Sequence, residues 1–145
     1  MLAIGADHGG YYLKEEIMKH LEKMGIAFKD FGSFSDEAID YPTIAAPVAK
    51  AVSEGEVERA ILVCGTGIGM SIAANKFKGI RAAVCGDTFS ARFTRLHNDA
   101  NILCLGARVT GGGLALDIVD LFLDTPFEGG KHLRRINLIS NIEKN

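Results

Sequence analysis

The stretch Ile61-Leu-Val-Cys-Gly-Thr-Gly-Ile-Gly-Met-Ser71 runs from an apolar strand pattern through a thiol into a glycine-rich turn. Glycines at alternate positions allow a tight turn whose backbone N–H groups point inward, and residues 71–75 are predicted to form the helix that follows. A nest of N–H groups of this kind can bind an anion beside Cys64. The succession of strand, turn and helix predicts one unit of an α/β fold with a reactive group at the turn.

The glycine spacing in this loop differs from that of the two best-known nucleotide-binding loops. Gly-x-Gly-x-Gly lacks the third interval of the dinucleotide fingerprint, and no Gly-Lys-Ser/Thr follows it as in a P-loop. A nucleotide is therefore not the first expectation. A purely structural alternative is that Cys64 is a small buried hydrophobe at the end of a strand and the glycines only form a turn.

Short apolar runs alternate along the chain with longer segments of helical period. The apolar runs are residues 2–4, 27–31, 60–63, 82–84 and 102–105, and the later helices are expected at 42–53, 88–96, 113–123 and 131–142. In the first helix, Leu13, Ile17, Leu21 and Met24 form one stripe that ends at Gly25, and the charged residues, Lys14 among them, fall largely off it. This alternation predicts an α/β fold, a Rossmann-like three-layer sandwich with a five-stranded parallel sheet flanked by helices.

Length and composition favour a single domain covering residues 1–145, because 145 residues with 48% hydrophobic content suit one core. The net charge of −2 and the absence of a Lys/Arg run argue against a nucleic-acid partner. No segment approaches the roughly 20 apolar residues that span a bilayer, and no basic leader precedes the first strand, so a cytoplasmic location is expected. Cys64, Cys85 and Cys104 lack metal-site or disulfide spacing.

Ligands of open α/β sheets bind beyond the carboxyl ends of the strands. Two unusual loops are expected at that edge, Asp7-His8-Gly9-Gly10 after the first strand and residues 65–69 after the third. Alone, Asp7 reads more simply as the N-cap of the first helix and His8 as a surface residue. The coincidence of the two loops favours a functional site.

Further polar residues lie around the fifth strand and on the terminal helix. The segment His97-Asn98-Asp99-Ala100-Asn101 is predicted to be a loop; it contains an imidazole able to move protons near neutral pH, although it also fits an Asn-rich turn. Arg108 follows the fifth strand, and Lys131 and Arg135 are spaced to present positive charge together, which suits a phosphate. The alternative for Lys131, Arg134 and Arg135 is a solvated basic face. The combination favours proton transfer on a phosphorylated small molecule.

Six motifs together resemble one known family over nearly the whole chain. They are Asp7-His8-Gly9-Gly10, Asp40-Tyr41-Pro42, Cys64-Gly65-Thr66-Gly67-Ile68-Gly69, Ala73-Ala74-Asn75-Lys76, His97-Asn98-Asp99-Ala100-Asn101 and Gly106-Ala107-Arg108. The chain is similar in these motifs to type B ribose-5-phosphate isomerases. That family also includes galactose-6-phosphate and allose-6-phosphate isomerases, so the motifs indicate the reaction class more firmly than the sugar.

The resemblance implies interconversion of ribose 5-phosphate and ribulose 5-phosphate through a cis-enediolate, without metal or organic cofactor, in the non-oxidative pentose phosphate pathway. One branch of the family uses the cysteine before the glycine loop as base, and the other uses a glutamate just after the loop. Cys64 and Met70 occupy these positions here. The chain therefore resembles the cysteine branch.

The resemblance also implies a role for each matching residue. Cys64 would move the proton from C2 to C1, and His97 with Thr66 would assist opening of the furanose ring. Backbone N–H groups of the loop would hold the enediolate oxygen; the loop residues of the predicted site are Gly65, Gly67, Ile68, Gly69, Met70 and Ser71. The expected sugar or phosphate contacts are Asp7, His8, Tyr41 and Asn98, and the expected phosphate cations are Arg108, Lys131 and Arg135. The family often has arginine where Lys131 stands, and lysine offers a point charge instead of a bidentate fork.

Members of the family form homodimers with shared active sites, so a homodimer is expected here, with a tetramer as the larger alternative. His97, Asn98 and Arg108 would then serve the partner's Cys64.

Two rival functions remain open from the sequence. One is a cysteine acyltransferase or hydrolase, which would leave a thioester on Cys64. The other is a flavodoxin-like module that senses a phosphorylated ligand and cannot exchange the hydrogen at substrate C2.

Overall fold

The computed structural model describes residues 1–144. Within them, five strands form one sheet: β1 (Leu2–Ala6), β2 (Phe28–Asp30), β3 (Arg59–Cys64), β4 (Ala82–Val84) and β5 (Ile102–Gly106). The strand order is β2-β1-β3-β5-β4, and each neighbouring pair is parallel. The helices are α1 (Tyr11–Lys23), α2 (Pro42–Ser53), α3 (Ile68–Ala74), α4 (Thr88–Asn98), α5 (Gly112–Asp124) and α6 (Lys131–Ile142). The expected α/β fold is confirmed.

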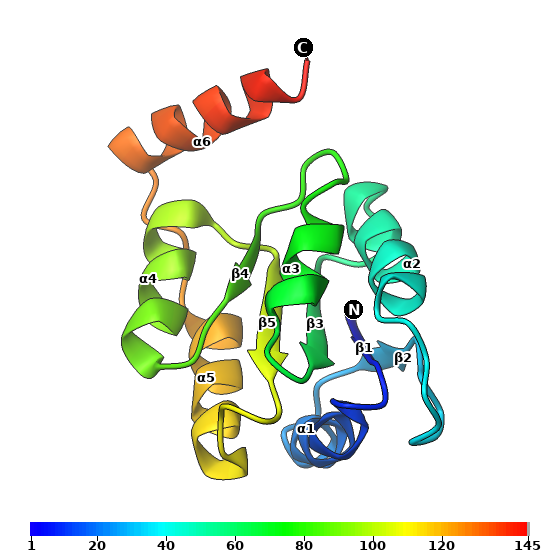
Figure 1. Cartoon of the computed structure of the whole chain (residues 1–145). Coiled ribbons are helices and arrows are strands. Elements are labelled where there is room, and N and C mark those ends of the chain that lie inside the picture. The colour runs from blue at the N-terminus through cyan, green and yellow to red at the C-terminus, as the bar shows by residue number, and fades with distance from the viewer. Residues whose placement is uncertain (145) are drawn as a thin grey trace.

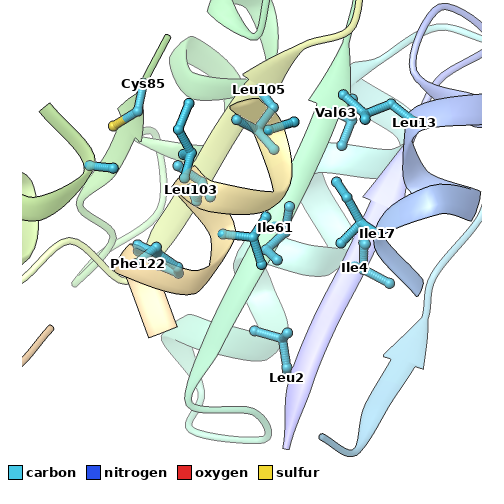
Figure 2. Close-up of a cluster of buried hydrophobic side chains, with 14 of the residues drawn as sticks. Leu2, Ile4, Leu13, Ile17, Ile61, Val63, Cys85, Leu103, Leu105 and Phe122 are labelled. Carbon is cyan, nitrogen blue, oxygen red and sulfur yellow. The ribbon is translucent and has the colours of Figure 1, made fainter. Parts of the chain in front are cut away.

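Helices cover both faces of the sheet because successive strand residues point to opposite sides. On one face, Ile4, Ile61 and Leu103 pack against residues of α1 and α5, such as Ile17 and Phe122 (Figure 2). Alternate strand residues pack on the other face against α2 and α3. Burial of a Leu, Ile or Phe side chain contributes about 1.5–3 kcal/mol, so these two apolar layers hold the strand ends in place.

Helix α6 extends from one end of the molecule, where it packs against α4 (Figure 1). It lies at the end of the sheet where the strands begin, opposite the end at which β3 and β5 finish. None of the described helices has both the length and the apolar character needed to cross a membrane.

Helices α3 and α4 depart from the predicted bounds. α3 begins at Ile68 instead of Ser71, because Gly67 adopts a left-handed conformation (φ 81°) that allows a helix to start within the glycine loop. α4 includes His97 and Asn98, which were expected in a loop, and its C-cap is Asp99, a left-handed residue (φ 45°). The Asp99 carboxylate accepts a hydrogen bond from Arg95 Nη1 at 2.7 Å, which stabilises this later helix end.

Lys14 is fully buried, although the helical pattern placed it off the apolar stripe. Its Nζ donates to both carboxylate oxygens of Asp30, at 2.8 and 2.9 Å, and to the Ser33 carbonyl at 2.6 Å. A buried cation needs a charged partner and further acceptors, and β2 together with the segment after it supplies both. Lys14 therefore ties α1 to β2 and to the chain that follows β2.

Candidate active site

The carboxyl ends of β1, β3 and β5 lie side by side. The sheet register pairs Ala6 with Val63 and Cys64 with Gly106, so the loops that follow these strands meet at one edge. Backbone hydrogen bonds join two of the loops: Ala107 N donates to the Cys64 carbonyl at 2.9 Å, and Arg108 N donates to the Gly65 carbonyl at 3.0 Å. The fold thus brings together three of the loops singled out in the sequence.

Cys64, the candidate base, ends β3 at this edge. Its Sγ accepts a hydrogen bond from the Gly67 N–H at 3.1 Å, at the start of α3. A Cβ at residue 67 would lie 3.0 Å from the Leu105 carbonyl carbon, so the close approach of the loop to β5 also requires glycine. The turn that donates to the sulfur is therefore fixed by backbone packing as well as by its positive φ.

The other two cysteines are less suited to act as bases. Burial raises the pKa of Cys85 to about 11, with a further contribution from the charge of Asp87. Burial raises the pKa of Cys104 further still. All three thiols are buried, but Cys64 differs in that it ends β3 and its Sγ accepts the Gly67 N–H.

The first loop is organised by Asp7. Its Oδ1 accepts hydrogen bonds from the N–H groups of Gly9 and Gly10, at 2.9 and 3.1 Å, and the N-cap of α1 is Gly10. The simpler reading of Asp7 as the N-cap is thus wrong, because the carboxylate holds the turn that precedes the helix. His8 is exposed, and its Nδ1 accepts the Ile39 N–H at 3.1 Å.

Tyr41 and Arg108 flank the glycine loop on its two sides. A Cβ at Gly69 would lie 2.7 Å from the Tyr41 Cζ atom, which places the phenol ring directly on the first turn of α3. A Cβ at Gly65 would lie 3.5 Å from Arg108 Nη1, so this guanidinium lies beside the Cys64 loop of its own chain. Arg108 was expected to serve the partner's site; in this structure the backbone of residues 106–108 is hydrogen-bonded to the loop of the same chain, which holds Arg108 beside its own Cys64 loop.

The remaining loop residues contribute through backbone or side-chain hydroxyls. Thr66 Oγ1 accepts the Ile68 N–H at 3.3 Å, and Ser71 Oγ donates to the Ile68 carbonyl at 2.7 Å. The Met70 side chain is fully buried in the core. Only its backbone can therefore face the site, as expected for an N–H donor.

Four predicted site residues, His97, Asn98, Lys131 and Arg135, lie at the opposite end of the molecule (Figure 1). α4 returns to the edge where β5 begins at Ile102, whereas Cys64 is paired with Gly106 at the far end of β5. A strand of this length spans about 13 Å at about 3.3 Å per residue. Within one chain, His97 does not lie beside Cys64.

His97 belongs to a cluster that the sequence analysis did not identify. Its ring is stacked on that of His132, with centroids 4.0 Å apart and planes at 12°, and it meets the Phe93 ring edge to face at 5.0 Å. Glu128 Oε2 lies 3.6 Å from His97 Nε2 and 3.8 Å from His132 Nε2. The only available signal was the spacing of Glu128 and His132 by four residues across a Gly-Gly turn.

The donor types in this cluster are those that bind zinc and similar metals. The geometry is unsuitable, however, because imidazole lone pairs lie in the ring plane and the two planes are nearly parallel. The two nitrogens therefore point side by side instead of converging on one ion. The arrangement suits proton handling better than metal binding.

An apolar surface adjoins the His97 cluster. Phe89 is 66% exposed beside the edge strand β4, and Leu138 and Ile142 of α6 are 59% and 69% exposed. A hollow of about 340 Å³ is lined by Phe89, Phe93 and His97 together with other residues of β4 and α4. An edge strand with exposed apolar side chains is typical of a protein interface.

The family model, a protein relative and two solved structures to which this chain is similar are all described as ribose-5-phosphate or ribose/galactose isomerases. The family described as ribose/galactose isomerase matches residues 2–139. Ribose-5-phosphate isomerase B of Escherichia coli (strain K12) is 51% identical over 143 residues, which cover 99% of this chain and 96% of that protein. The structure of the Clostridium thermocellum ribose-5-phosphate isomerase B is similar with a TM-score of 0.97 at 55% identity, covering 99% of this chain and 97% of that one. The Thermotoga maritima enzyme gives 0.94 at 48% identity, with 97% coverage of both chains.

Proposed function

The chain belongs to the ribose/galactose isomerase family and is an isomerase, and from this premise we propose that it interconverts ribose 5-phosphate and ribulose 5-phosphate with Cys64 as general base. Membership in an isomerase family removes the acyltransferase and sensor alternatives. The observation that carries the proposal is the Cys64 Sγ at the end of β3, 3.1 Å from the Gly67 nitrogen and beside a turn of N–H donors.

The reaction moves one proton between adjacent carbons of the open-chain sugar. Cys64 Sγ takes the proton from C2, the C2 electron pair forms a C1=C2 double bond, and negative charge appears on O1. Return of the proton to C1, with transfer of the O2 hydroxyl proton to O1, gives the ketose. The same group acts as base and then as acid, so the step needs no other reactant.

The glycine loop supports this step electrostatically. Charge that develops on the enediolate oxygen faces the backbone N–H groups of residues 65–70 at the first turn of α3. Donors held in place by packing stabilise such charge without reorganisation, and removal of one typically costs about 10²–10³ in kcat. Asp7, His8 and Tyr41 border the loop and are assigned to the sugar hydroxyls and phosphate.

The active unit in this proposal is a homodimer with shared sites. His97, Asn98, Lys131 and Arg135 of one chain would reach the Cys64 loop of its partner, because they do not lie beside it in their own chain. The exposed apolar side chains of β4, α4 and α6 supply a surface for that contact. In the assembled site His97 and Thr66 open the furanose ring, and Lys131 and Arg135 add to the positive charge that Arg108 presents to the phosphate. A tetramer of two such dimers is the larger alternative for the assembly. We also propose a cytoplasmic location, which suits an enzyme that acts on charged phosphosugars.

Ribose 5-phosphate is the proposed substrate over allose 6-phosphate and galactose 6-phosphate. The experiment is to measure kcat/KM on all three under one set of conditions. The proposal expects the highest value on ribose 5-phosphate, and a higher value on either hexose phosphate would contradict it.

The role of Cys64 is tested by Cys64→Ala with Cys85→Ala as the matched control. General acid–base catalysis contributes about 10²–10⁴ in rate, so Cys64→Ala should lower kcat by about 10³ or more with an unchanged fold by circular dichroism. Cys85→Ala should retain most of its turnover. Near-normal kcat in Cys64→Ala would assign the base to another residue.

A further inference from the structure

Glu128 is placed between two imidazoles that belong to different helices. Its Oε2 lies 3.6 Å from Nε2 of His97 on α4 and 3.8 Å from Nε2 of His132 on α6. The Glu128 backbone N–H donates to the Leu96 carbonyl at 3.0 Å, which holds the residue beside the last turn of α4. This backbone hydrogen bond anchors Glu128 next to Leu96, the residue before His97, and so keeps the Glu128 carboxylate near the His97 ring.

The two imidazoles differ in burial. His132 is buried, and burial lowers its pKa below the ordinary value; positive charge on His97, Lys131 or Arg135 lowers it further, whereas Glu128 opposes the shift. These effects favour the neutral form of His132. The side chain of His97 is more exposed, at 39%, and its Nε2 is the imidazole nitrogen nearer to the Glu128 carboxylate.

The His97 ring is restrained on several sides. His132 covers one face at 4.0 Å, Phe93 meets it edge to face, and Glu128 faces Nε2. The ring also lines the hollow of about 340 Å³ beside β4 and α4. These contacts fix the orientation of the His97 ring at the wall of the hollow. An imidazole with a fixed orientation can direct its proton to one position on a bound substrate.

We propose that Glu128 and His132 are positioning residues that hold the His97 imidazole as the acid that opens the furanose ring of the substrate. This inference rests on the proposed function, in which His97 serves the partner's Cys64 loop. The Glu128 carboxylate, 3.6 Å from His97 Nε2, attracts the protonated ring electrostatically and limits its rotation, and the stacked His132 ring supplies a flat support. Neither residue touches the sugar in this role.

The ring-opening step balances without any other reactant. Protonated His97 donates to the ring oxygen O4, the C1–O4 bond breaks with its electron pair moving to O4, and C1=O1 forms as the O1 hydroxyl releases its proton to solvent. The imidazole then regains a proton from solvent. The product is the open-chain aldehyde, whose C2 proton Cys64 can take.

Ribulose 5-phosphate provides a substrate that does not need this step. Its C5 oxygen carries the phosphate, so it cannot close a five-membered ring onto the C2 ketone. Deuterium incorporation at C1 of ribulose 5-phosphate in deuterated water therefore reports proton transfer by Cys64 without ring opening. Conversion of ribose 5-phosphate to ribulose 5-phosphate requires both steps.

The test compares Glu128→Gln and Glu128→Asp with Glu54→Gln, the matched control at the exposed C-cap of α2. Glu128→Gln should lower kcat/KM for ribose 5-phosphate by about tenfold, part of the 10²–10⁴ that acid–base catalysis supplies, while deuterium incorporation stays within about twofold of the unaltered protein. Glu128→Asp should recover part of the loss. Glu54→Gln should change neither rate.

Two outcomes would overturn the inference. If Glu128→Gln lowered both rates equally, Glu128 would support the site as a whole, and if it lowered neither, the carboxylate would have no part in the reaction. Failure of the proposed function is separate, because the unaltered protein would then incorporate no deuterium. Since the Glu128 side chain is 56% exposed, the substituted protein should remain folded, and far-UV circular dichroism checks this.

Discussion

The loop around Cys64 and the cluster around His97 are assigned to the same substrate, yet the chain builds them differently. The Cys64 loop is closed within one chain, because Gly67 packs on Leu105 and a Cβ at Gly10 would lie 2.4 Å from the Val63 carbonyl oxygen. His97 is half-exposed, beside an apolar surface that the chain does not cover. The fold thus preforms the Cys64 half of the candidate site within one chain, whereas in the proposed homodimer the His97 half is completed by association of two chains.

Gly67→Ala should have the largest effect on the preformed half. The added Cβ would lie 3.0 Å from Leu105 and the residue would keep a φ of 81°, so the turn that donates to Cys64 must move. Movement of this turn would also displace the N–H groups assigned to the enediolate oxygen, and loss of one such donor typically costs about 10² or more in kcat. Steady-state kinetics on ribose 5-phosphate measures the loss.

Gly55→Ala is the matched control, because Gly55 also has a positive φ of 76° but nothing lies within 4 Å of its Cβ position. Backbone strain alone should cost about 1 kcal/mol of stability at either site and leave kcat of Gly55→Ala unchanged. An unchanged kcat in Gly67→Ala would show that the loop need not be preformed.

Arg135→Ala should have a smaller effect on the other half, and of another kind. Attraction between the guanidinium and the phosphate exists before and during the reaction, so KM should rise by about tenfold while kcat changes little. Arg134→Ala, its exposed neighbour on α6, is the control and should leave KM near its normal value. An Arg135→Ala protein with unchanged KM would remove this residue from the site.

The sequence was sufficient for the regular elements because their apolar periodicity is strong. The predicted helices at residues 42–53 and 131–142 are confirmed at both ends. The burial of Lys14 was missed because its partner Asp30 lies on another element, and the early start of α3 was missed because Ile68 stands between two glycines. Periodicity describes neighbours along the chain and not side-chain pairs formed across it.

The same distinction separates the predicted part of the candidate site from the part that was missed. Loops that follow strands could be placed at one edge of a parallel sheet by rule, so the grouping of Asp7 with the Cys64 loop is confirmed. The contact of Glu128 and His132 with His97 depends on how α6 packs on α4, which no local pattern encodes. The part of the site determined by sheet topology was predictable, and the part determined by helix packing was not.

The most direct test of the split site is complementation between two inactive variants, Cys64→Ala and His97→Ala. Refolding or co-expressing them together forms mixed dimers in which one of the two sites receives an intact Cys64 and an intact His97. If the site is shared by two chains, random pairing should restore about a quarter of normal turnover, although each variant alone is inactive. If Cys64 and His97 act within one chain, every site in the mixture carries a defect, and the absence of any restored turnover would contradict the account.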